Sequence, residues 1–67
     1  MIKSKIIIHN STDMEDTIAL DYANKALKEI IINKQELELG DSRYFVFNTG
    51  VKVQVEQNKT CKTIIIY

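Results

Sequence analysis

The 67-residue sequence has no proline and no tryptophan, and it has only two glycines, one cysteine and one histidine. A single cysteine excludes an intrachain disulfide, and one cysteine with one histidine cannot complete an ordinary zinc site. The formal net charge is zero, which argues against non-specific attraction to nucleic acid or acidic membranes. Because so short a chain buries only about 60% of its unfolded surface, we expect a partner chain to supply further stabilisation.

Long hydrophobic runs are also missing, since no apolar run exceeds four residues. We therefore expect no signal peptide and no membrane span, and the lone cysteine indicates a reducing, cytoplasmic setting. Isoleucine occurs eleven times, lysine eight times and asparagine five times, whereas alanine occurs three times and arginine once. The abundant residues have AT-rich codons, which favours a gene from a low-GC bacterium, a phage or a mobile element.

The hydrophobic pattern predicts one α+β domain over residues 1–67. Residues 2–9 alternate as a strand does, and residues 13–32 carry an apolar stripe at helical spacing, with Asn33 as the C-terminal stop. Further strands are expected at about 36–39, 43–47, 51–57 and 61–67. The predicted order is β-α-β-β-β(-β), a mostly antiparallel four- or five-stranded sheet with one helix packed on one face.

The predicted helix has two features besides its main stripe. Thr12 and Glu15 have the spacing of a capping box at its N-terminus. A second, shorter apolar stripe, formed by Met14, Ile18 and Tyr22, lies off the main arc. We expect a monomer to leave much of this second stripe in contact with water.

A conflict of coverage predicts assembly. Three strands are apolar on both faces, at residues 6–8, 45–47 and 64–66, and such strands normally lie in sheets covered on both sides. One helix covers only one face, so we predict a homodimer, a higher oligomer or a dedicated protein partner. The alternative is a sheet that curls around its own side chains. The candidate interface residues are Met14, Ile18, Tyr22, Ile7, Phe45, Phe47, Ile64 and Ile66.

Few residues could carry chemistry. His9 and Cys61 are the one base–nucleophile pair, and they approach only if the first and last strands pair antiparallel. The acidic residues Asp13, Glu15 and Asp16, near His9, are explained by the positive end of the helix dipole. The sequence has no glycine-rich phosphate loop and no nucleophile elbow. We expect no enzyme activity, no cofactor and no metal.

Two functions from different classes remain. The leading hypothesis is a small non-enzymatic protein-binding module, homodimeric, such as a phage or mobile-element accessory or inhibitor protein. The alternative is single-stranded nucleic-acid binding, because residues 43–47 resemble over five positions the aromatic strand of RNA-recognition-motif sheets. Tyr44 and Val46 stand where that family has small residues. The phosphate contacts of the alternative would come from Lys3, Lys5, Lys52 and Lys62.

Overall fold

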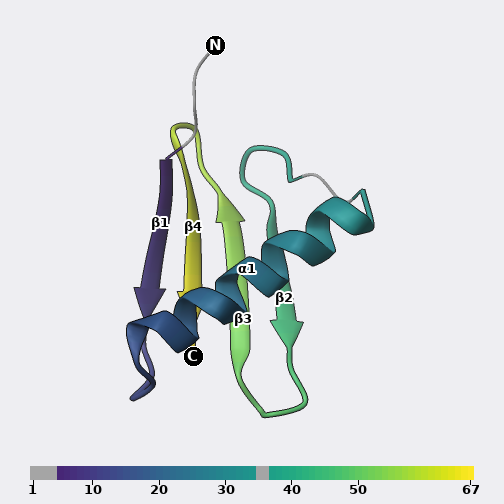
Figure 1. Ribbon diagram of the computed structural model, residues 1–67. Coiled ribbons are helices and arrows are strands. Elements are labelled where there is room, and N and C mark those ends of the chain that lie inside the picture. Colours follow the sequence, from purple (N-terminus) through teal and green to yellow (C-terminus); the bar gives the residue numbers. More distant parts are fainter. Residues whose placement is uncertain (1–4, 35–36) are drawn as a thin grey trace.

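The computed structural model describes residues 5–34 and 37–67. Along the chain it has the elements β1 (Lys5–Asn10), α1 (Asp16–Ile32), β2 (Ser42–Val46), β3 (Lys52–Gln57) and β4 (Cys61–Ile66). The strands form one four-stranded sheet in the order β1-β4-β3-β2, and α1 crosses one of its faces diagonally (Figure 1). The predicted α+β class with one helix on one face is confirmed.

The sheet is mixed rather than wholly antiparallel. The pairs β2–β3 and β3–β4 are antiparallel, as expected for strands joined by short turns. The pair β1–β4 is parallel, because the chain crosses the sheet through α1 before β2, β3 and β4 fold back toward β1. The first strand therefore lies at one edge of the sheet, beside the last strand, and β2 forms the other edge.

The helix begins at Asp16, three residues later than the sequence predicted. The side chain of Asn10 holds the preceding turn: its amide donates to the Met14 carbonyl (2.8 Å), and its Oδ1 accepts from the Thr12 backbone N–H (3.0 Å). The Thr12 hydroxyl in turn accepts from the Met14 N–H (3.1 Å). The expected capping box does not form, since Glu15 occupies the N-cap position without a side-chain capping bond.

The helix ends at Ile32, with Asn33 as its C-cap, as predicted. The Asn33 N–H donates to the Glu29 carbonyl (3.0 Å), and the next residue, Lys34, donates to the Ile31 carbonyl (3.2 Å). Lys34 takes a positive φ of 52°, the left-handed conformation that commonly closes a helix and that favours glycine. The backbone of Lys34 is therefore strained in this conformation, whereas a glycine at position 34 would not be.

A strand was expected at residues 36–39. Residues 37–39, which the structure describes, do not form a strand. Position 36 lies outside the described residues. Gly50, with φ of 88°, takes the positive-φ position of the β2–β3 hairpin, where Phe47 donates to the Val51 carbonyl (2.9 Å). Within the described ranges the sheet therefore has four strands.

The core lies between α1 and the two central strands. Alanines at one helical face let the helix approach the sheet closely, and branched side chains of β3 and β4 fill the space beneath it. The buried residues are Ala19, Ala23, Ala26, Ile30, Val53, Val55, Ile64 and Ile66. The helix contacts β1 as well as the two central strands, yet the side chains of the two edge strands are less completely buried than those of β3 and β4.

Candidate functional site

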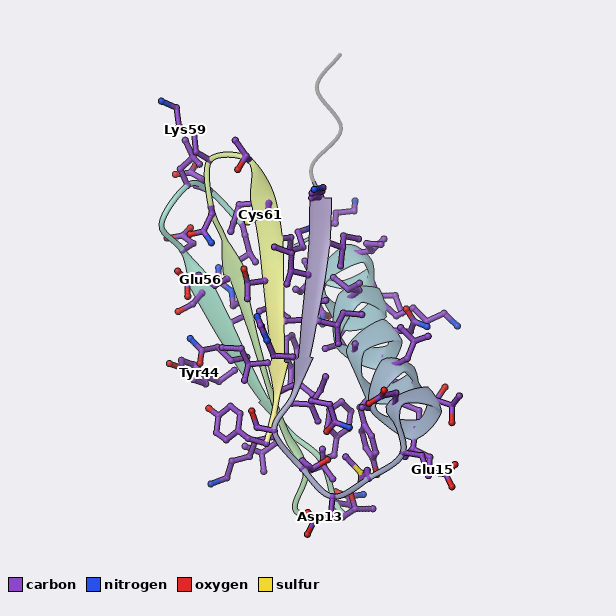
Figure 2. The ribbon with its side chains drawn as sticks, turned by 90° about the vertical axis from the view of Figure 1, so that its left-hand side faces the viewer. Asp13, Glu15, Tyr44, Glu56, Lys59 and Cys61 are labelled. Carbon is purple, nitrogen blue, oxygen red and sulfur yellow. The ribbon has the colours of Figure 1, made fainter. Side chains whose placement is uncertain are left out.

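Strand alternation assigns each sheet residue either to the face under α1 or to the open face. The registers place Ile8 beside Ile64, and Ile64 beside the buried Val55, so these three side chains share the helix side. Ile7 and Tyr44, one residue out of step, share the open side. Figure 2 shows Tyr44 directed away from the helix.

Four of the candidate interface residues lie on the helix side, not on the uncovered face. Ile64 and Ile66 are 0% exposed and belong to the core, and Phe45 and Phe47 are partly buried against it. The prediction that Ile64 and Ile66 lie on the uncovered face was wrong, because the side chains of these two residues of β4 point toward α1. Ile65 takes the open face instead.

The stripe of Met14, Ile18 and Tyr22 is divided by the fold. The Tyr22 ring packs edge-on against Phe47, with 5.1 Å between ring centroids, and its hydroxyl lies 2.9 Å from the Thr49 hydroxyl. Met14 packs against the core from the turn before α1. Ile18 remains 47% exposed. Only one of the three side chains is therefore largely free to contact a partner.

An exposed cluster of isoleucines lies on β1. Ile6, Ile7 and Ile8 are 55%, 39% and 37% exposed, although isoleucine is among the residues most often buried. Within the described part of the chain, β1 has a neighbouring strand on one side only, β4. Of the predicted interface residues, Ile7 belongs to this cluster, whereas Ile6 and Ile8 were not singled out from the sequence.

The free edge of β1 presents backbone groups as well as side chains. The N–H groups of Lys5 and Ser11 donate to the carbonyls of Thr60, just before β4, and of Ile66, its last residue, at 3.2 and 2.8 Å. In a parallel pair, the residues that bond the neighbour alternate with residues whose N–H and C=O point away. The outward-pointing residues of β1 are therefore Ile6, Ile8 and Asn10.

Two hollows flank β1 on the helix side. One, of about 300 Å³, is lined by Ile8, Asn10, Asp16, Ala19 and Leu20, and it joins the edge strand to the N-terminal half of α1. The other, of about 570 Å³, is lined by Ile30, Ile31, Lys34, Leu37 and Lys62. The register places Lys62 beside Ile6, so the second hollow borders the start of the same strand. The apolar surface of β1 thus continues onto the exposed flank of α1.

The predicted lysine set is split between the two faces. Lys5 and Lys52 lie on the open side, together with Tyr44 (63% exposed) and Tyr67 (41% exposed). Lys62 lies on the helix side and lines a hollow, and Lys3 lies outside the described residues. The open face therefore combines two lysines with two exposed tyrosines, a pairing that the sequence analysis did not identify.

The structure does not bring His9 and Cys61 together. Because β1 and β4 are parallel, Lys5 lies beside Cys61, and His9 lies beside Ile65, about 13 Å further along the strand. The Cys61 thiol is instead near the Thr63 hydroxyl, at 3.9 Å. Among the residues that the structure describes, no three His, Cys, Asp or Glu side chains gather in a metal-binding group.

Comparison with known proteins gives no matching family model, no matching curated protein and no matching solved structure. Over residues 5–34 and 37–67, no helix is both long enough and apolar enough to cross a membrane. Function is therefore inferred from the surface of the molecule, where the β1 edge and the adjoining flank of α1 expose Ile6, Ile8 and Leu20.

Proposed function

We propose that the protein is a small, non-enzymatic protein-binding module that acts through its surface and associates with a second copy of itself. The observation that carries this proposal is the exposure of Ile6, Ile7 and Ile8 on an edge strand, continued by Leu20 on the helix. Contiguous exposed apolar surface with a polar rim is typical of protein interaction sites.

The driving force of the proposed association is burial of this aliphatic surface, at about 25 cal/mol for each Å² removed from water. The formal net charge of zero means that two copies do not repel each other through net charge. A partner chain also supplies buried surface that a chain of this length lacks on its own. The AT-rich codon preference supports placing such a module among phage or mobile-element accessory or inhibitor proteins.

Solution mass tests this function directly. Light scattering or sedimentation equilibrium on the full chain, from micromolar to millimolar concentration, is expected to give about twice the 7.7 kDa of one chain. The dimer fraction should rise with concentration according to mass action. A mass of one chain that persists at millimolar concentration would contradict self-association.

A second candidate function, single-stranded nucleic-acid binding, is favoured by one observation. Tyr44 and Tyr67 are exposed on the open sheet face that also carries Lys5 and Lys52. Exposed aromatic rings can stack on bases while lysines contact phosphates. Anisotropy of a labelled single-stranded oligonucleotide should then show binding that weakens with salt and is lost in Tyr44→Ala. No binding at low salt would exclude this function.

A further inference from the structure

We propose that β1 pairs antiparallel with β1 of a second copy, about a two-fold axis at Ile7, so that two four-stranded sheets become one continuous eight-stranded sheet. This inference rests on the proposed self-association and specifies its geometry. It follows from the backbone of the edge strand, the order of its side chains and the positions of its charges.

Backbone groups of β1 point toward its free edge. Ile6, Ile8 and Asn10 direct their N–H and C=O groups away from β4, at the free edge of the sheet. Natural edge strands are usually protected by proline, an inward charge, a bulge or a covering segment. The Ile6–Ile8 segment contains neither proline nor charge, and it pairs with β4 in unbroken register. Such an edge is suited to receive another strand.

The alternation of these backbone groups limits where the two-fold axis can lie. Outward-pointing residues of one strand must face outward-pointing residues of the other, so Ile6 or Ile8 must face an even-numbered residue. The two-fold axis lies between the two strands, and it must be level with a residue, either Ile7 or Ile8, rather than with the peptide bond that joins them. A one-residue slip would turn the outward backbone groups of one strand toward inward-pointing residues of the other.

The order of the side chains along β1 favours an axis at Ile7. An axis at Ile7 places Ile6 opposite Ile8 of the second copy, Ile8 opposite Ile6, and Ile7 opposite Ile7. An axis at Ile8 would instead place Ile6 opposite Asn10 and Ile7 opposite His9. Cross-strand pairs of branched aliphatic side chains stabilise a sheet. The Ile7 axis therefore matches apolar with apolar at all three exposed isoleucines.

The charges of β1 can be placed in the same register. With the axis at Ile7, Lys5 of each copy lies opposite His9 of the other, and the two lysines lie at opposite ends of the paired strands. The antiparallel pairing thus keeps the two lysines apart, whereas like charges in opposed positions would be destabilising. The charge pattern of β1 is therefore compatible with this register.

The hollow lined by Ile8 and Leu20 lies beside the proposed contact. On the helix side, Ile6 of the second copy would lie beside Ile8, at the mouth of this hollow. On the open side, the two Ile7 side chains would meet. The contact would therefore remove apolar surface from water on both faces of the sheet, as well as pairing the free backbone groups.

Cysteine cross-linking tests this geometry. In the Cys61→Ser background, Ile7→Cys would place two cysteines opposite each other, with about 4.5 Å between their Cα atoms. That distance suits a disulfide, which needs about 4.4–6.8 Å. We expect this variant to form a covalent dimer in a thiol redox buffer at least about tenfold faster than the matched Val46→Cys variant, which places its cysteine on the β2 edge.

A second variant tests the position of the axis. With the axis at Ile7, two cysteines introduced by Ile8→Cys would stand about 8 Å apart, too far for a relaxed disulfide. Linking at position 8 but not at position 7 would overturn the axis at Ile7. A chain that is dimeric by mass but links no faster at either β1 position than at Val46 would overturn edge pairing while leaving self-association intact. A monomeric mass would instead contradict the proposed function.

Discussion

The two edges of the sheet differ in how they meet solvent. At the β2 edge, the Arg43 guanidinium donates to the Ser42 carbonyl (3.2 Å), a group that the alternation of the β2–β3 pair directs away from the sheet. At the β1 edge, three consecutive isoleucines are exposed between Lys5 and His9, with no charge among them. At β2 the charged Arg43 lies within the strand and bonds an outward carbonyl, whereas the apolar run of β1 lies between Lys5 and His9; we infer that β1 is the edge better suited to pairing.

The largest effect is expected from placing a charge on the unprotected edge. Ile8→Lys replaces, in both copies of the proposed two-fold contact, an isoleucine that the contact would bury, so its effect counts twice. The expected loss is about 4 kcal/mol, or about a thousandfold weaker dimerisation. Sedimentation equilibrium of the variant measures the dissociation constant, and circular dichroism shows whether the monomer remains folded.

The matched control is Val46→Lys at the β2 edge, because Val46 is also an exposed aliphatic residue of an edge strand. We expect this variant to dimerise as the unmodified chain does. If both lysine variants weakened the dimer equally, the proposed difference between the two edges would be wrong.

A second prediction compares covered with uncovered isoleucines. Ile64→Ala creates a cavity under α1, since Ile64 is fully buried, and we expect a loss of about 3 kcal/mol in the free energy of unfolding. Ile31→Ala changes a side chain that is 75% exposed and should cost less than about 0.5 kcal/mol. Urea denaturation at one fixed chain concentration measures both. Similar losses in the two variants would contradict the assignment of the core.

A third prediction concerns the turn that joins the β1 edge to α1. Asn10→Ala removes the side-chain hydrogen bonds to Met14 and Thr12 that shape this turn. We expect a loss of about 1–2 kcal/mol in the free energy of unfolding. Asn10→Asp keeps the acceptor for Thr12 but turns the donor into an oxygen that faces the Met14 carbonyl and the Asp16 carboxylate, so it should lose at least as much. Equal stability of Asn10→Ala and the unmodified chain would show that the turn does not depend on this side chain.

The smallest expected effect is at the other end of the helix. Lys34 has a positive φ, so Lys34→Gly relieves a conformation that a side chain disfavours. We expect a gain of about 0.5–1 kcal/mol in the free energy of unfolding. A matched substitution at Lys28, within the helix, should be destabilising, because glycine is a poor helix former. A loss of stability in Lys34→Gly would contradict the left-handed cap.

Much of the fold was predictable because it depends on local pattern. The helix and its end at Asn33 follow from apolar spacing, and the β2–β3 hairpin follows from the Asn48–Gly50 loop. The start of the helix was less predictable. Its position depends on hydrogen bonds of the Asn10 side chain that compete with a capping box at Thr12.

The arrangement of the candidate site was not predictable from local pattern. Strand order and the parallel β1–β4 pair depend on contacts between the two ends of the chain. A run such as Ile64–Ile66 fits either face, because periodicity alone does not say which alternate residues lie inward. The run at Ile6–Ile8 carried a usable signal, since a strand outside any hairpin is a candidate for a sheet edge.

Amide hydrogen exchange at the two edges tests the proposed pairing most directly. The N–H groups of Ile6 and Ile8 point outward at the β1 edge, and those of Tyr44 and Val46 point outward at the β2 edge. In solutions concentrated enough to be dimeric, we predict that exchange at Ile6 and Ile8 slows at least about tenfold relative to dilute solution, while Tyr44 and Val46 stay fast. Fast exchange at Ile6 and Ile8 in a chain shown to be dimeric would contradict pairing through β1.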